Sequence, residues 1–262
     1  MEISRKDWMS YVKRLSTLNN KAADEMRRFI DANGVEDVRG MIDYAYALAT
    51  KYGEASAALS AEMYDAIAAL EKGLLPAAEM AETASYGEVA KTVQGIMKTS
   101  VNTEQISTAV GRLVKQAGAD TTLKNAIRDR AEYAWIPVGD TCAFCLMLAS
   151  NGWQPATKRA VEGDHAEHIH ANCDCTYAIR FSKDDNVRGY DPGEYKRMYY
   201  AGADVPFENE NDSHPESRSI VKQRLNGLRR ANYAQNKDKI NAQKREAYAL
   251  RKQAIEDGEI KP

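Results

Sequence analysis

All four cysteines of this 262-residue chain lie in one stretch, between Thr141 and Tyr177, together with three of its four histidines. Cys142 and Cys145 are separated by two residues, the spacing at which two thiolates converge on one tetrahedral Zn²⁺. The motif His170-Ala-Asn-Cys173-Asp-Cys175 can supply the other pair of ligands. A metal held by both motifs would close the loop between them, so the fold must bring residues 142–145 and 170–175 together.

A structural zinc site takes four protein ligands, and this stretch offers more good candidates than places. The candidates are Cys142, Cys145, His170, Cys173 and Cys175. The first two form the knuckle, and the other three compete for the remaining two places. His165 and His168 are weaker candidates, because such histidines are more often solvated or hydrogen-bonded to a ligand. We expect a structural zinc cofactor.

Three states of these thiols are open from the sequence: a metal site, free or redox-active thiols, and disulfides. The residues after Met1 show no signal peptide, and no run approaches the roughly 18 apolar residues of a membrane span. We therefore expect the chain to be made in the cytoplasm and to have no membrane partner. Thiols stay reduced there, which favours metal, and a Cys173–Cys175 disulfide would be strained by its short loop.

Residues 1–131 show the apolar periodicity of helices and no convincing strand. We expect four helical stretches, over residues 4–33, 35–70, 85–100 and 101–131. Ser4 caps the first, which ends at Asn33-Gly34, and a capping box at Ser85–Glu88 begins the third. Gly53 can divide the second, and Gly118 interrupts the fourth. Together they predict an antiparallel helical bundle as the first domain, in a chain that is mainly α.

The sequence changes character at Glu132, and residues 132–208 are predicted to form a small zinc-stapled α+β lobe. Aromatic and branched residues over 133–138 and 173–181 favour two strands, with a short helix over 144–148 and another after Asp191. Antiparallel pairing of the two strands would bring both cysteine motifs together.

Residues 209–262 are predicted to form a basic helical C-terminal arm behind a polar linker. Within 216–253, eleven Lys or Arg stand against three Asp or Glu, a net charge of +8, so the rest of the chain carries −10 of the total of −2. Tyr233 and Tyr248 are interleaved with these charges. This pattern fits either backbone-level contact with DNA or docking onto an acidic protein surface.

Two enzymatic alternatives involve the same stretch. His165-Ala166-Glu167 matches the H-x-E triplet of zinc deaminases, but here the C-x-x-C comes before it instead of after it. Asp164-His165 beside a cysteine knuckle suggests an HNH-like nuclease, although no helix with further metal ligands is predicted after His170. A zinc-containing nucleic-acid enzyme is therefore the second interpretation, behind a structural protein without catalytic residues.

Over roughly residues 4–182 the chain resembles the Mu F-like group of tailed-phage minor capsid and head-morphogenesis proteins. The similarity lies in Asp140-x-Cys142-x-x-Cys145-x-x-Leu148, in His170-x-x-Cys173-x-Cys175 leading into a strand, and in the helical region before them. Members of that group often have Arg between the last two cysteines, where this chain has Asp174.

The resemblance implies a structural role at the portal or inside the phage head, during assembly or during DNA packaging and delivery. It implies portal and capsid proteins as partners and the virion as location. Contact with packaged DNA through the basic arm 216–253 is an expectation from charge alone, because the arm lies outside the similar region.

Overall fold

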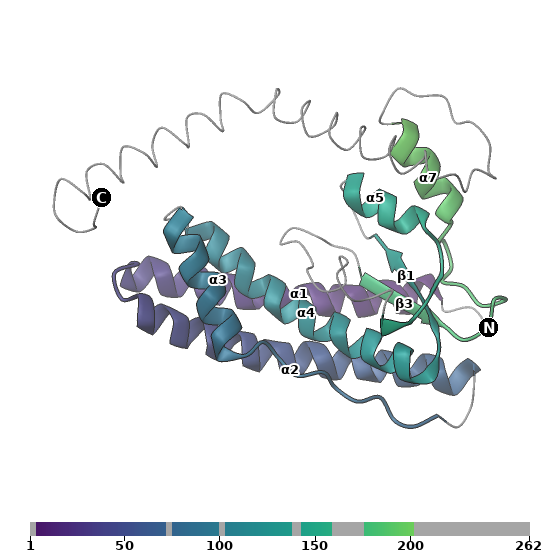
Figure 1. Ribbon diagram of the computed structural model, residues 1–262, viewed down its shortest axis with the longest axis horizontal. Coiled ribbons are helices and arrows are strands. Elements are labelled where there is room, and N and C mark those ends of the chain that lie inside the picture. The colour runs from purple at the N-terminus through teal and green to yellow at the C-terminus, as the bar shows by residue number, and fades with distance from the viewer. Residues whose placement is uncertain (1–3, 72–74, 100–102, 138–142, 159–175, 202–262) are drawn as a thin grey trace. The chain divides into compact units, whose positions relative to one another are not determined.

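The computed structural model describes residues 4–71, 75–99, 103–137, 143–158 and 176–201. In chain order these form α1 (Arg5–Asn33), α2 (Val38–Glu71), α3 (Tyr86–Thr99), α4 (Thr103–Asp129), β1 (Glu132–Ile136), α5 (Ala143–Ser150), β2 (Gln154–Pro155), β3 (Thr176–Arg180) and α7 (Pro192–Ala201). The long helices α1, α2 and α4 pack side by side, and the small sheet lies against one end of them (Figure 1). The predicted mainly helical fold with a small antiparallel sheet is confirmed.

The predicted helix ends are confirmed where they were assigned to capping residues. The hydroxyl oxygen of Ser4 accepts a hydrogen bond from the Asp7 N–H at 3.1 Å, and α1 stops at Gly34, whose φ is 75°. Ser85 and Glu88 form the reciprocal capping box of α3, through Ser85 N–H to Glu88 Oε2 at 2.8 Å and Glu88 N–H to Ser85 Oγ at 3.3 Å.

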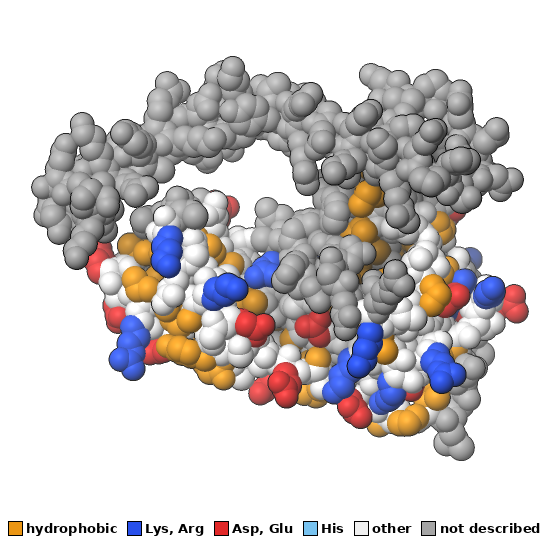
Figure 2. Space-filling view, in the orientation of Figure 1, with side chains coloured by type: hydrophobic (Ala, Val, Ile, Leu, Met, Phe, Trp, Pro, Cys, Tyr) orange, Lys and Arg blue, Asp and Glu red, His pale blue; other side chains and the backbone are white. Residues whose placement is uncertain are grey.

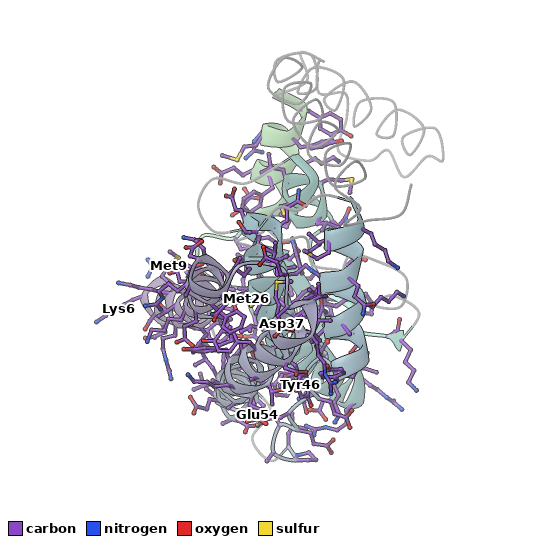
Figure 3. All side chains as sticks on the ribbon, turned by 90° about the vertical axis from the view of Figure 1, so that its left-hand side faces the viewer. Lys6, Met9, Met26, Asp37, Tyr46 and Glu54 are labelled. Carbon is purple, nitrogen blue, oxygen red and sulfur yellow. The ribbon has the colours of Figure 1, made fainter. Side chains whose placement is uncertain are left out.

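The apolar stripe predicted for the first helix is the buried face of α1. Its fully buried members are Trp8, Tyr11, Val12, Leu15, Ala22, Met26 and Ile30. Met26 lies between the helices, whereas Lys6 and Met9 lie on the outer side of α1 (Figure 3).

Two glycines that were expected to interrupt helices lie inside unbroken ones, so this part of the prediction is wrong. A Cβ at Gly53 of α2 would stand 2.8 Å from Thr83 Cγ2, and a Cβ at Gly118 of α4 would stand 2.6 Å from Ser56 Oγ. Each glycine permits a close approach of neighbouring segments. Because that packing offsets the low helix propensity of glycine, the helices continue through both positions.

A segment without helix or strand, residues 75–84, lies between α2 and α3 and was not predicted. Its half-buried side chains are Leu75, Ala78, Ala81, Thr83 and Ala84. Its backbone bonds to helix side chains: Asn125 accepts from Glu79 N–H at 2.9 Å and donates to Glu79 O at 2.8 Å. Asp65, Thr121 and Arg128 bind the backbone on either side of Glu79. These contacts satisfy polar groups that secondary structure leaves unpaired.

The sheet has the order β2-β1-β3, and both pairings are antiparallel. The predicted pairing of the two longer strands is confirmed, with Glu132 opposite Arg180 and Ile136 opposite Thr176. The two-residue strand β2 was missed, because its Pro155 argues against a strand except at a sheet edge, which is where it lies.

A left-handed residue turns the chain from α4 into β1. Arg130 has a φ of 56°, Ala131 N–H donates to Ala126 O at 2.9 Å, and Arg130 N–H donates to Ile127 O at 3.4 Å. This is the Schellman arrangement, with an arginine where glycine is usual. It allows β1 to begin directly after α4.

The bundle and the sheet share one apolar cluster. Trp8, Tyr11 and Leu59 of the helices pack with Ala134, Ile136 and Ala178 of the strands and with Tyr190. By its contacts the chain divides into two compact units, residues 1–196 and 197–262. The domain limits predicted after residues 131 and 208 stay predictions.

In the part of the chain that the structure describes, no helix is long and apolar enough to cross a membrane. The predicted basic arm, including residues 216–253, lies outside the described residues.

Candidate metal centre

The sheet brings the strand ends that lead to the two cysteine motifs to the same side. Ile136, the last residue of β1, pairs with Thr176, the first residue of β3, which follows Cys175 directly in the sequence. The chain leaves β1 toward Cys142 at this end and enters β3 from Cys175 at the same end. The antiparallel register is therefore compatible with the predicted convergence of the two motifs.

Cys145 is the one candidate ligand among the described residues, and it lies in the first turn of α5. Its side chain is 1% exposed and packs with Leu123, Trp135 and Tyr177. The rings of Trp135 and Tyr177 meet edge to face, with centroids 4.2 Å apart. Leu123, Trp135 and Tyr177 pack against Cys145, and such an apolar environment would limit the access of water to an ion bound there. The first turn of a helix also favours a negatively charged ligand.

The other four candidates, Cys142, His170, Cys173 and Cys175, lie outside the described residues, as do His165 and His168. Among the residues that are described, no group of three or more His, Cys, Asp or Glu side chains could hold a metal ion. The zinc staple is therefore a proposal, and its donor set of thiolates and imidazole is one that Zn²⁺ prefers.

A buried hydrogen bond joins α1 to α2 beside the sheet. The hydroxyls of Tyr11 and Ser60 share it at 3.0 Å. Burial raises the pKa of Tyr11, and hydrogen bonding, first of all with Ser60, opposes part of that rise. Sequence reasoning missed it, because Tyr11 matched the apolar stripe of its helix.

At the opposite end of the sheet, an ion pair joins β1 and β3. Arg180 donates to Glu132 Oε2 from Nη2 at 2.6 Å and from Nε at 2.7 Å, and the guanidinium carbon lies 4.8 Å from the ring centroid of Trp153. Arg180 and Glu132 are direct cross-strand partners. This pair was not predicted, since only the register shows that the two residues face each other.

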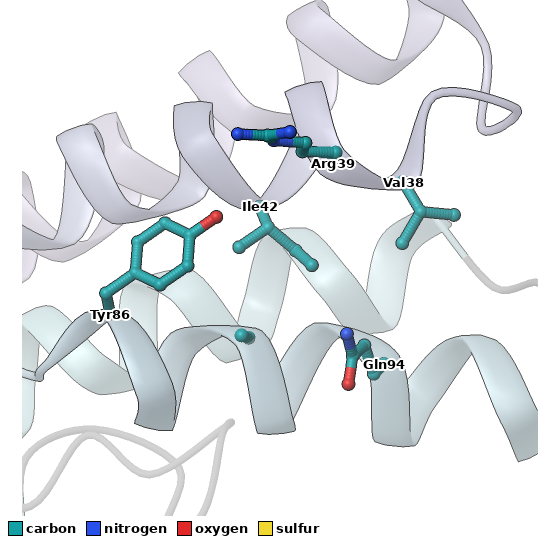
Figure 4. Close-up of a pocket in the computed structure, with 6 residues that line it drawn as sticks. Val38, Arg39, Ile42, Tyr86 and Gln94 are labelled. Carbon is teal, nitrogen blue, oxygen red and sulfur yellow. The ribbon is translucent and has the colours of Figure 1, made fainter.

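A pocket of about 500 Å³ lies between α2 and α3 (Figure 4). It is lined by Val38, Arg39, Ile42, Tyr86, Ala90 and Gln94. The Tyr86 hydroxyl donates to Asp43 at 2.7 Å, and this bond raises the pKa of Tyr86. The lining combines the Arg39 cation, the Tyr86 hydroxyl and the Gln94 amide with three apolar side chains.

On the visible face of the described residues, basic and acidic side chains are interspersed (Figure 2). This face therefore has no single-sign surface of the kind that follows a nucleic-acid backbone.

The sequence model of the VG15 protein family matches residues 2–202. The chain belongs to the VG15 protein family. VG15 is a family of phage or viral gene proteins, so the expected phage association is confirmed at this level. The match includes the helical bundle, the sheet and both cysteine motifs, and it ends before the basic segment 216–253. No curated protein and no solved structure matches the chain.

Proposed function

We propose that this VG15-family chain is a minor capsid protein of a tailed phage, acting in head assembly at the portal or inside the head. The proposal rests on the Cys/His motif pair of the Mu F-like group in a chain of a phage family. The supporting structural observation is the pairing of Ile136 with Thr176, because the segments that lead to the two motifs leave the sheet at this end. The long helices α1, α2 and α4 pack against one another and would support the lobe where it contacts the portal and capsid proteins.

We propose further that the lobe is a structural zinc site held by Cys142, Cys145 and two of His170, Cys173 and Cys175. Bound zinc would supply a crosslink between the two motifs, worth roughly 10–16 kcal/mol of apparent binding free energy in small zinc domains. Trp135, Tyr177 and Leu123 would exclude water from the Cys145 side of the site.

Location in the phage particle tests the proposed role. Antibodies or mass spectrometry would measure the protein in purified procapsids and mature heads, and co-purification with the portal would test the partner. We expect a few copies per head, and their loss from heads when Cys145 is replaced by Ser. A protein that is absent from both particles and does not bind the portal would contradict a structural role.

The basic segment 216–253 is proposed to contact the packaged DNA, and its net charge of +8 supports this. Each phosphate neutralised should contribute about −0.9 to the slope of log K against log salt. Binding that is strong at low salt and collapses at high salt is expected. A salt-insensitive interaction, or none, would favour an acidic protein surface as the partner.

An HNH-like nuclease is the alternative function, and its candidate residues Asp164 and His165 lie outside the described part of the chain. Incubation of the purified protein with plasmid and Mg²⁺ or Mn²⁺ tests it. Cleavage that disappears in His165→Ala would replace the structural proposal with an enzymatic one.

A further inference from the structure

The pocket between α2 and α3 combines an apolar surface with exposed polar groups. Its least exposed lining residue is Ile42, at 4%, and Val38 and Ala90 are half-buried, so these three form the apolar part. Arg39 of α2 and Gln94 of α3 are exposed and lie on the two helices that border the pocket (Figure 4). With a volume of about 500 Å³, the pocket has room for a large side chain of a ligand. A concave apolar surface with a few polar groups is the usual form of a binding site.

Tyr86 lines the same pocket with a side chain that is exposed yet held in place. It is 43% exposed, its hydroxyl donates to Asp43 at 2.7 Å, and its ring meets that of Tyr46 edge to face, with centroids 5.4 Å apart. Because these contacts hold the side chain before any ligand arrives, binding would cost little further side-chain order. Tyr and Arg side chains are enriched at protein-binding surfaces, so this pair of lining residues is typical of such a surface.

Arg39 is the only cation among the lining residues that the structure describes, and within that part of the chain no ion pair or hydrogen bond engages it. Two acidic residues close to it in the sequence are bonded elsewhere: Asp43 accepts from the Tyr86 hydroxyl, and Asp37 accepts from a backbone N–H at 2.9 Å. The guanidinium therefore keeps its donors for a ligand, and its planar fork matches the two oxygens of a carboxylate.

The charges near Arg39 favour a single carboxylate over a chain of phosphates. The stretch 36–43 carries three carboxylates against one guanidinium, so its field opposes a polyanion. Gln94 adds an amide that donates and accepts at once, which is the hydrogen-bonding pattern of a peptide group. An apolar surface, a group that binds a carboxylate and a group that binds a peptide unit together fit a segment of protein.

We propose that this pocket is a docking site for a segment of a partner protein, which inserts one large apolar side chain against Val38, Ile42 and Ala90 and places a carboxylate on Arg39. The ring of Tyr86 would flank the inserted side chain. The inference rests on the proposed function for the source of the segment, a portal or capsid protein of the head, and it does not depend on zinc.

The test uses the full chain, isotope-labelled, and follows its backbone amide signals by nuclear magnetic resonance during titration. The probe is N-acetyl-leucine, which combines the apolar side chain, the carboxylate and one peptide group. N-acetyl-leucinamide lacks the carboxylate, N-acetylalanine lacks the large side chain, and a short DNA duplex supplies phosphates instead. The variants are Arg39→Gln and Ala90→Leu, which fills the pocket. The matched control is Arg27→Gln, an exposed arginine of α1 that pairs with Asp24.

We expect N-acetyl-leucine to bind at roughly millimolar concentration, as its small size allows, and to shift the amides of residues 38–42 and 86–94. Removal of its carboxylate should weaken binding by about tenfold in the wild type and in Arg27→Gln. The same removal should change nothing in Arg39→Gln, because the charge-assisted hydrogen bonds are already lost there. Ala90→Leu, and the replacement of the probe by N-acetylalanine, should each weaken binding by about tenfold or more.

Equal affinities of N-acetyl-leucine and N-acetyl-leucinamide for the wild type would overturn the inference, as would an absence of shifts or shifts confined to other residues. A DNA duplex that shifted the same amides more strongly would overturn it in favour of a nucleic acid. If Ala90→Leu failed to fold, Arg39→Gln would still decide, because Arg39 is exposed. Each of these results would leave the proposed role in the head untouched, whereas absence of the protein from heads would refute that role and leave the binding measured here unchanged.

Discussion

Replacing Asn125 by Ala should release the segment 75–84 from α4. Asn125 is fully buried, and it makes two hydrogen bonds with the backbone of Glu79, at 2.9 and 2.8 Å. Each such bond contributes about 1 kcal/mol net. The vacated volume adds to the cost, while the higher helix propensity of Ala returns roughly 0.5 kcal/mol. We therefore expect a loss of about 2 kcal/mol in the free energy of unfolding.

Urea unfolding followed by circular dichroism measures this loss, and native-state hydrogen exchange locates it. The amides of Glu79 and Ala81 should exchange faster in the variant, because they donate to Asn125 and Thr121 in the wild type. Asn20→Ala is the matched control, an exposed asparagine of α1 whose replacement should change stability by at most about 0.5 kcal/mol. A loss below about 0.5 kcal/mol for Asn125→Ala would refute the reasoning that the segment is held by this side chain.

Three further outcomes follow from the packing and from one titrating group. Gly118→Ala should cost about 1–3 kcal/mol in urea unfolding despite its gain in helix propensity, because the new methyl group would meet Ser60 Oγ; a stabilised variant would contradict this. Arg130→Gly should stabilise by roughly 0.5–1 kcal/mol, since glycine adopts the φ of 56° without strain; a loss in the same assay would be evidence against this account of the turn. Hydrogen bonding to Arg128, and then to Tyr64, lowers the pKa of Asp129 below its ordinary value, so its stabilisation is present above about pH 4 and is lost as pH falls through the lower, folded-state pKa. Asp129→Asn should therefore flatten the stability profile below about pH 4.

The helices could be predicted because their signals are local. Apolar residues recur at helical spacing from Trp8 to Ile30. The helix ends were predictable because the side chains of Ser4 and of the Ser85–Glu88 pair, and the backbone of Gly34, act within one turn. The pairing of β1 with β3 was also predictable, because both runs are aromatic and branched.

What could not be predicted depends on contacts between distant residues. Gly53 and Gly118 act as helix breakers in isolation, and only the neighbouring segment explains why the helix continues. The segment 75–84 has no period of helix or strand, because its backbone bonds go to side chains of Asp65, Thr121, Asn125 and Arg128. A tyrosine in an apolar stripe gave no sign that the hydroxyl of Tyr11 would share a buried hydrogen bond with Ser60 of α2.

The candidate metal centre is a prediction from ligand type and spacing, and the structure adds that β1 and β3 have the ends that lead to its two motifs on the same side of the sheet. The pairing of Ile136 with Thr176 joins residues that are far apart in the sequence, and the motifs alone do not specify which residues pair. Burial of Cys145 against Trp135 and Tyr177 likewise follows from the sheet and from the position of α5 beside it.

Zinc content per chain is the most direct measurement. The full protein would be purified without added metal, and zinc would be determined by elemental mass spectrometry for wild type, Cys145→Ser and the surface control Asn20→Ala. The account predicts one zinc per chain in wild type and in Asn20→Ala, and none tightly held in Cys145→Ser. A wild-type chain without zinc, or a Cys145→Ser chain that keeps it, would contradict the claim that the two cysteine motifs form one metal centre.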